Sequence, residues 1–176
     1  VAGSDITQGL PRVVELFEAR PPKGESIICE INGKVSGIEN ADKTIIVKIE
    51  TQDKNTKEVE YQIPAGSTLK VSQGELVAKG SKLNEGNIEL KHLYKTMGWE
   101  EVHRYIIREI QEIYASQGEG INDKHIEIII RQMFSRLNIS DPGDTNLLVG
   151  DIIEKDEFEE VNEKARVSGK NPAKGE

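Results

Sequence analysis

Hydrophobic residues recur along this chain with two different periods, and the change of period limits the folds it can adopt. Across residues 26–86 apolar and polar side chains alternate, as at Ile27, Cys29 and Ile31, which is typical of strands with one buried face. Beyond Gly86 apolar residues recur every three or four positions, which predicts amphipathic helices. Strands and helices in separate blocks predict an α+β fold.

Turn signals divide the period-two region into five or six short strands. They are Asn32-Gly33, residues 40–43, residues 51–57 and residues 64–66, which are rich in the Asn, Gly, Asp and Pro that turns favour. Strands this short and closely spaced predict a small barrel or sandwich.

The end of this region carries two glycines six residues apart, Gly74 and Gly80, on either side of the apolar pair Leu76-Val77. We predict that both glycines take positive φ at tight turns. The spacing resembles the barrel-sandwich hybrid fold of biotinyl and lipoyl carrier domains and of several RNA polymerase modules. The resemblance implies a fold and not a function.

A short helix is predicted near the N-terminus, over residues 11–20, after a loop-like stretch of small and polar residues. Pro11 suits a first helical turn, Val13 and Leu16 share a face, and Pro21-Pro22 ends the helix. About ten residues are marginal as an isolated helix in water, so this helix needs a partner surface.

The second half of the chain is predicted to contain long amphipathic helices. An apolar stripe from Leu90 to Tyr114 is interrupted at Gly98, and a second helix begins after Asn122 as N-cap. We expect the two to pair as an antiparallel helical hairpin. The second helix presents one apolar face, formed by Ile126, Ile129, Ile130, Met133, Phe134 and Leu137. A strand over residues 147–153, an acidic helix over 154–167 and a frayed tail over 168–176 are expected to follow.

Charge and cysteine content exclude several classes of protein. The net charge is −8, which argues against a dedicated nucleic-acid-binding domain, although residues 151–163 alone contribute seven acidic side chains. The single cysteine, Cys29, excludes an internal disulfide and suits a reducing cytoplasm. No apolar run approaches the ~20 residues that span a bilayer.

Residues able to perform catalysis or bind a metal are few and scattered. Cys29 shares a strand face with Ile27, which favours a core residue over a nucleophile. His92 and His103 would lie about 16 Å apart on one helix at ~1.5 Å per residue, too far to share a metal. His125 lies beside Asp123 in a first helical turn, where a structural or solvated role is expected. We predict no catalytic residue and no metal site.

Several basic residues could contact phosphate, but an ordinary role on the solvated surface is the stronger interpretation. Lys124, Arg131 and Arg136 are predicted on the second long helix, and Arg104 and Arg108 on the first. Most such residues solvate an exposed face or pair with a nearby glutamate. Phosphate contact is the alternative.

The sequence around Lys43 would suit a carrier domain. Asp42-Lys43-Thr44 lies between predicted strands and is similar to the Asp-Lys-Ala hairpin that carries lipoate in swinging-arm domains. The match is partial, because those domains have two quasi-symmetric halves and only one glycine motif is present here. One alternative function is therefore a stand-alone biotinyl or lipoyl carrier or adaptor domain. The other interpretation of Lys43 is an ordinary solvated lysine in a turn.

Three segments together resemble the beta-prime subunit family of bacterial DNA-directed RNA polymerases, in that family's order. Residues 3–20, GSDITQGLPRVVELFEAR, resemble the distal half of its trigger loop; residues 121–127, INDKHIE, with Arg131-Gln132-Met133, resemble its jaw; residues 141–145, DPGDT, with Leu148 and Gly150, complete the match. The resemblance covers nearly the whole chain.

The resemblance implies a division into a distal trigger loop at 1–25, a barrel-sandwich hybrid module at 26–87, a helical hairpin of the jaw at 88–140, and a strand, acidic helix and tail at 141–176. The trigger loop gates nucleotide addition in this family, which assigns gating to Gly9, Leu10, Pro11, Arg12 and Val13, with hinge freedom at Gly3 and Gly9. The jaw lies near downstream duplex DNA, which makes Lys124, His125, Arg131 and Arg136 the DNA-binding candidates.

The resemblance also implies an activity and partners. The chain would be an inactive portion of a longer nucleotidyltransferase, with the family's magnesium and zinc sites and its substrate-contacting methionine and histidine outside it. Its expected partners are the remaining polymerase subunits, downstream duplex DNA and regulators at the jaw, without a membrane, in the bacterial cytoplasm.

Overall fold

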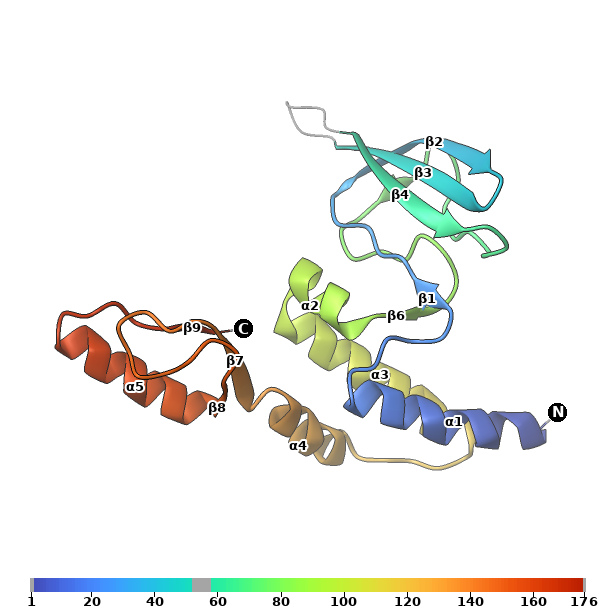
Figure 1. Cartoon of the computed structure of the whole chain (residues 1–176). Coiled ribbons are helices and arrows are strands. Elements are labelled where there is room, and N and C mark those ends of the chain that lie inside the picture. The colour runs from blue at the N-terminus through green and yellow to red at the C-terminus, as the bar shows by residue number, and fades with distance from the viewer. Residues whose placement is uncertain (1, 52–57, 176) are drawn as a thin grey trace. The chain divides into compact units, whose positions relative to one another are not determined.

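A computed structural model describes the backbone of residues 2–51 and 58–175 and the side chains of residues 9–51 and 58–175. It divides the chain into two compact units, Val1–Gly120 and Ile121–Glu176 (Figure 1). The boundary lies within the predicted hairpin segment, residues 88–140. The two long helices that we predicted to pair lie in different units, so their pairing stays a prediction.

A four-stranded antiparallel sheet, curled into a half-barrel, forms the β part of the first unit. Its order is β4-β3-β2-β5, and the strands are β2 (Gly33–Ala41), β3 (Thr44–Thr51), β4 (Glu58–Pro64) and β5 (Leu76–Val77). The pairing of β2 with β3 shifts register between Val35 and Gly37, which marks a bulge. The predicted turn at residues 40–43 is present, whereas most of the one at 51–57 lies outside the described residues.

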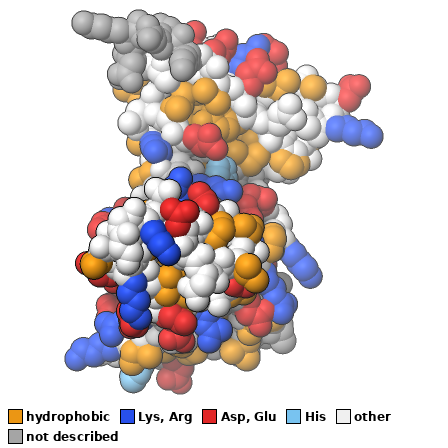
Figure 2. Space-filling view, turned by 60° about the vertical axis from the view of Figure 1, so that its left-hand side comes forward, with side chains coloured by type: hydrophobic (Ala, Val, Ile, Leu, Met, Phe, Trp, Pro, Cys, Tyr) orange, Lys and Arg blue, Asp and Glu red, His pale blue; other side chains and the backbone are white. Residues whose placement is uncertain are grey.

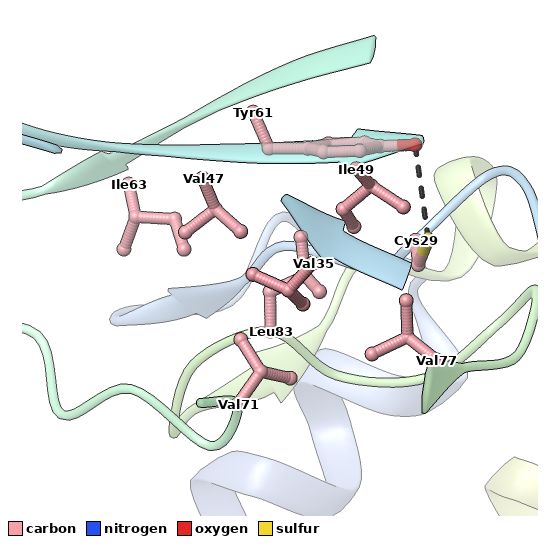
Figure 3. Close-up of a cluster of buried hydrophobic side chains, with 9 residues drawn as sticks. All are labelled: Cys29, Val35, Val47, Ile49, Tyr61, Ile63, Val71, Val77 and Leu83. Carbon is pink, nitrogen blue, oxygen red and sulfur yellow. Dashed lines mark hydrogen bonds between the residues drawn. The ribbon is translucent and has the colours of Figure 1, made fainter. Parts of the chain in front are cut away.

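A single cluster of apolar side chains fills the curl of this sheet (Figure 3). Cys29 is fully buried in it, so the prediction of a core cysteine is confirmed. Gly74 and Gly80 both have φ of +87°, as predicted, and they turn the chain so that the segments on either side of β5 return beneath the sheet. The other members are Val35, Val47, Ile49, Tyr61, Ile63, Val71, Val77 and Leu83.

Three helices and a two-stranded parallel sheet complete the first unit. They are α1 (Ala2–Phe17), α2 (Leu90–Met97) and α3 (Trp99–Ser116), with β1 (Glu25–Ser26) paired to β6 (Asn87–Ile88). The predicted break at Gly98 is confirmed, since its φ of +88° ends α2 and starts α3. Helices beside a mainly antiparallel sheet confirm the α+β class.

The predicted start of the N-terminal helix was wrong. The helix begins at Ala2 and runs through Pro11, which lies in its interior. Small and polar residues have weak helix propensity, so local sequence favours a loop there. Proline also lacks the N–H of an interior position, which makes a helix start the favoured local interpretation.

The second unit combines two helices with a three-stranded antiparallel sheet of order β8-β7-β9. Its elements are α4 (Asp123–Met133), β7 (Arg136–Asp141), β8 (Ile152–Glu154), α5 (Lys155–Val167) and β9 (Lys174–Gly175). The predicted Asn122 cap is confirmed, because its side chain accepts a hydrogen bond of 3.0 Å from the Lys124 amide. The acidic helix is confirmed as α5.

Two predicted boundaries in this unit were wrong. The second long helix ends at Met133, and Arg136 and Leu137 lie on β7 instead, where Leu137 pairs with Ile153. The predicted strand over 147–153 is reduced to β8. The spacing of Ile130, Phe134 and Leu137 is that of a helix, whereas the spacing of Leu137 and Ile139 is that of a strand. Leu137 lies on a strand because β7 pairs with β8 and β9.

The C-terminal tail is ordered by specific contacts, contrary to the frayed end that we predicted. The Asn162 side chain donates to the Ala173 carbonyl at 3.0 Å and accepts from the Ala173 amide at 2.7 Å. Both residues are buried. This two-way hydrogen bond positions β9 against β7.

Candidate functional site

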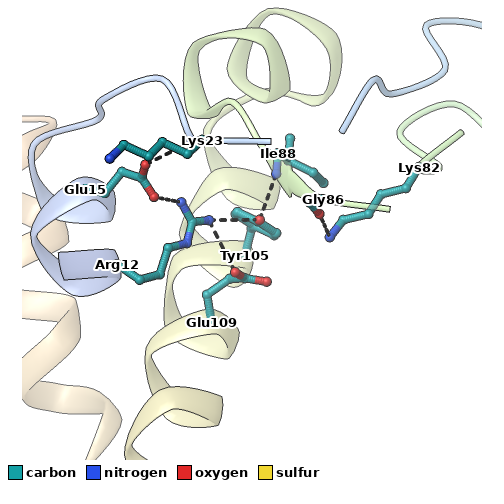
Figure 4. A network of polar contacts seen from close by, with 8 residues as sticks. All are labelled: Arg12, Glu15, Lys23, Lys82, Gly86, Ile88, Tyr105 and Glu109. Carbon is teal, nitrogen blue, oxygen red and sulfur yellow. Dashed lines mark hydrogen bonds and ion pairs between the residues drawn. The ribbon is translucent and has the colours of Figure 1, made fainter. Parts of the chain in front are cut away.

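A polar network around Arg12 joins α1 to α3 in the first unit (Figure 4). We call it the Arg12 network. Arg12 Nη1 lies 2.6 Å from Glu15 on its own helix, and Nη2 lies 3.2 Å from the Tyr105 hydroxyl and 3.3 Å from Glu109 on α3. The guanidinium side chain is 13% exposed, so solvent screens these charges weakly.

Tyr105 is the centre of this network, and its side chain is buried. Its hydroxyl accepts a hydrogen bond of 3.0 Å from the Ile88 amide of β6 and one from Arg12, and Glu109 is a further hydrogen-bond partner. A phenolic hydroxyl has one donor and two acceptor positions. All of them are therefore used.

Opposing effects set the pKa of Arg12 in this network. Burial alone would lower the pKa of Arg12, but hydrogen bonds to Glu15 and Glu109 and the proximity of Tyr105 outweigh it and raise that pKa. Burial is the main cause of the raised pKa of Tyr105. Tyr105 is therefore a neutral hydroxyl beside a permanent cation at neutral pH.

Two further cations lie against the Tyr105 ring. Lys82 Nζ lies 5.8 Å and the Arg108 guanidinium 5.5 Å from its centroid, within the range of cation–π attraction. Lys82 also donates to the Gly86 carbonyl at 2.9 Å, and burial lowers its pKa. Tyr105 thus contacts side chains or backbone from α1, β6 and the loop before β6.

Gly9 lets α1 approach α3 closely. A Cβ atom at Gly9 would lie 2.7 Å from Gln117 Nε2 and 3.0 Å from Ile113 Cγ2, so a side chain there meets α3 directly. Beside this contact is an open pocket of about 910 Å³, lined by residues of both helices that include Arg12, Glu15 and Glu109. Its walls carry both signs of charge.

The five predicted gating residues divide into two sets on α1. Gly9 and Arg12 face α3 through the contacts above, and Val13 is partly buried. Leu10 and Pro11 are exposed, Leu10 with 63% of its surface. Their gating role stays a prediction.

The four predicted DNA-binding residues are exposed in the second unit. Lys124, His125 and Arg131 lie on α4, with Lys124 and Arg131 seven residues apart and hence on one helical face. Arg136 lies on β7, opposite Glu154 of β8. Figure 2 shows positive and negative side chains interspersed over the face in view, so the surface charge is mixed there.

The remaining basic and histidine candidates have local partners. Arg104 pairs with Glu101 at 2.9 Å and Glu100 at 3.7 Å on the same helix, which fits the solvated-face interpretation. His92 lies 2.9 Å from Glu30, and the His103 ring lies against Trp99. Among the described side chains, those of residues 9–51 and 58–175, no group of three or more His, Cys, Asp or Glu is arranged to hold a metal ion.

Lys43 lies at the exposed tip of the hairpin between β2 and β3. Its carbonyl accepts a hydrogen bond of 3.0 Å from the Ala65 amide, which ties this tip to the end of β4.

None of the helices that the structure describes is long and apolar enough to cross a bilayer.

Sequence reasoning missed the centre of the site. Tyr105 was predicted only as part of an apolar helical stripe, and Glu15, Glu109 and Ile88 were given no role. A tyrosine within a buried stripe does carry a signal, because its hydroxyl needs a hydrogen-bond partner. Nothing in the sequence indicates that the partner is Arg12, ninety-three residues away.

Comparison with known proteins identifies the family of the chain. Residues 2–165 match the family model described as RNA polymerase Rpb1, domain 5. The chain belongs to this family. It is 51% identical over 175 residues to the DNA-directed RNA polymerase subunit beta' of Caldicellulosiruptor saccharolyticus, and 50% identical over 173 residues to that of Acetivibrio thermocellus.

The subunit beta' of Halalkalibacterium halodurans is 48% identical over 176 residues. These alignments cover 98–99% of the chain and 14–15% of each relative. The Rpb1 domain 5 match thus confirms the predicted beta-prime resemblance, and the chain spans about one seventh of the curated relatives it matches. The comparisons give no support to the carrier alternative.

Proposed function

We propose that this Rpb1 domain 5 chain acts as a segment of an RNA polymerase beta-prime subunit and takes part in DNA-templated RNA synthesis, without catalysing nucleotide addition alone. The observation that carries the proposal is identity of about half over almost the entire chain to subunits named for that activity. Its partners are then the remaining polymerase subunits, in the bacterial cytoplasm.

Within that function, α1 is proposed to be the distal half of a gating element. Its attachment to α3 supports this role, because Gly9 and Arg12 fix one face of the helix while Leu10 and Pro11 stay exposed. A helix interrupted by proline has a weakened hydrogen-bond ladder. An element of low local stability can change conformation when a ligand favours one form.

The second unit is proposed to act as the jaw, with its basic side chains toward downstream duplex DNA and regulators at its surface. Exposure of Lys124, His125, Arg131 and Arg136 supports this. The net charge of −8 limits such contacts to local ones, since phosphate binding depends on clustered cations.

A segment exchange tests the main proposal. The matching segment of the Caldicellulosiruptor saccharolyticus subunit is replaced by this chain, and the chimeric subunit is assembled into polymerase. We expect RNA synthesis on a DNA template at a rate comparable with that of the unaltered enzyme. A control chimera carries a segment of scrambled sequence. An assembled but inactive exchange enzyme would reject the proposal.

Intact mass measurement addresses the carrier alternative. We expect Lys43 to be unmodified when the chain is produced in bacteria that lipoylate and biotinylate their own carrier proteins. A lipoyl or biotinyl adduct on Lys43 would favour the carrier instead.

A further inference from the structure

We infer that Tyr105 is a positioning residue that couples the β6 backbone to the gating helix α1, so that displacement of one is transmitted to the other. This inference rests on the proposed gating role of α1. It assigns to a single hydroxyl a connection between the two that is separate from the pairing of β1 with β6.

The geometry of the hydroxyl supports coupling. It accepts from the Ile88 amide at 3.0 Å and from Arg12 Nη2 at 3.2 Å, and these donors belong to β6 and α1. Movement of either donor therefore changes the position that the hydroxyl can offer to the other.

The surroundings hold the ring in one place. Tyr105 is 3% exposed, and Lys82 and Arg108 lie near the ring. A buried aromatic ring fixed by neighbours cannot follow one donor without losing the other. The junction therefore has few alternative arrangements.

Arg12 provides the attachment on the α1 side. Its Nη2 is shared between Tyr105 and Glu109, while Nη1 binds Glu15, whose other oxygen accepts from the Lys23 amide at 3.3 Å. The same guanidinium thus links α3 to α1 and to the turn that follows α1. When the Tyr105 hydroxyl is lost, Arg12 still binds Glu15 and Glu109. Helix α1 therefore stays near α3, but its position is less precisely fixed.

The test uses polymerase assembled with full-length beta-prime subunit that contains this segment. Tyr105→Phe removes only the hydroxyl, Arg12→Gln removes the cation, and a double variant combines them. Tyr114→Phe on α3 is the matched control, because it makes the same chemical change outside the Arg12 network. Hydrogen exchange is read at the Ile88 amide and at residues 13–17, and nucleotide addition is timed over a range of nucleotide concentrations.

Coupling predicts reciprocal effects. Tyr105→Phe should raise exchange at residues 13–17 by about tenfold, and Arg12→Gln should raise exchange at the Ile88 amide although it does not touch β6. The double variant should show less than the product of the single effects. Maximal nucleotide-addition rate should fall while the nucleotide concentration at half-maximal rate changes little, because α1 is misplaced and no nucleotide contact is removed.

Exchange and rate separate the two proposals. Unchanged exchange at residues 13–17 in Tyr105→Phe, or multiplicative effects in the double variant, would overturn coupling whatever the rate does. Exchange that changes as expected at an unaltered addition rate would support coupling and reject the gating role of α1. If Tyr105→Phe also raises exchange throughout β2 and β3, the substitution destabilises the whole unit, and the test then rests on Arg12→Gln. Unchanged exchange of the Ile88 amide in Arg12→Gln would overturn coupling.

Discussion

Arg12 on α1 and Glu109 on α3 are ninety-seven residues apart in sequence, yet Arg12 Nη2 lies 3.3 Å from Glu109 Oε2. Both side chains are largely buried, with 13% and 15% exposed. A pair this sheltered is sensitive to the loss of one partner, since the remaining charge keeps its desolvation cost.

Replacing Glu109 should therefore loosen α1. Glu109→Gln removes the charge but keeps the size, and Glu15 still pairs with Arg12. We expect a loss of about 1 kcal/mol in the stability of the docked helix, measured by hydrogen exchange at residues 13–17. Glu112→Gln is the control, because Glu112 lies one turn further along α3 on the wall of the same open pocket but is exposed. Equal effects of the two substitutions would contradict the importance of the buried pair.

Substitutions at Gly9 should depend on size. Gly9→Ala gains about 1 kcal/mol of helix propensity, and its new methyl group meets the flexible end of Gln117, so we expect little net change. Gly9→Val adds bulk toward Ile113 and gains less helix propensity than alanine does, and overpacking typically costs about 1–3 kcal/mol. Exchange at residues 13–17 measures both. Comparable exchange in the two variants would show that α1 does not pack through Gly9.

Stability of the β core should fall at high pH. Burial raises the pKa of Tyr61 from 10.0 to about 12, so the folded state retains a proton that the unfolded state loses. The contribution is complete below pH 10 and is lost as the pH rises toward 12. Two pH units correspond to roughly 3 kcal/mol.

Denaturant unfolding of the 176-residue chain at several pH values measures this loss. Tyr61→Phe should make stability fall less steeply above pH 10, while Tyr94→Phe at an exposed position is the control. Curves of the same steepness for wild type and Tyr61→Phe would contradict the role of Tyr61. Tyr105 contributes with the same sign, because burial also raises its pKa.

The C-terminal strand should depend on Asn162. Asn162→Ala removes both hydrogen bonds to Ala173 and leaves buried backbone groups unpaired, at a cost of about 1–3 kcal/mol. Trypsin should then cut faster after Lys170 and Lys174. Asn162→Asp keeps the acceptor but places a buried carboxylate oxygen against the Ala173 carbonyl, so it should also speed cleavage. Unchanged cleavage in Asn162→Ala would show that β9 is held by its pairing with β7 alone.

Charge reversal should reveal the DNA-facing side of the second unit. In assembled polymerase, Arg131→Glu with Arg136→Glu should weaken binding of downstream duplex DNA and reduce its salt dependence by about one unit for each lost phosphate contact. Lys170→Glu with Lys174→Glu in the same unit changes the net charge by the same amount and is the control. An unaltered salt dependence in the double variant would remove these residues from the DNA interface.

The sequence by itself determined the structural class of most segments. Alternation around Cys29 and Val47, the break at Gly98 and the cap at Asn122 are local patterns, and the structure confirms each because their causes act within a few residues. The motifs at residues 3–20 and 121–127 were enough to predict the family.

Tertiary structure decided what depends on distant partners. Helix α1 extends back to Ala2, and Gly9 lies against Ile113, a contact that no local pattern encodes. Leu137 lies on a strand because β8 and β9 flank it, and the tail is ordered because Asn162 binds Ala173. The Arg12 network formed for the same reason: buried charges and hydroxyls must find partners, and only the folded chain brings Arg12, Tyr105 and Glu109 within reach of one another.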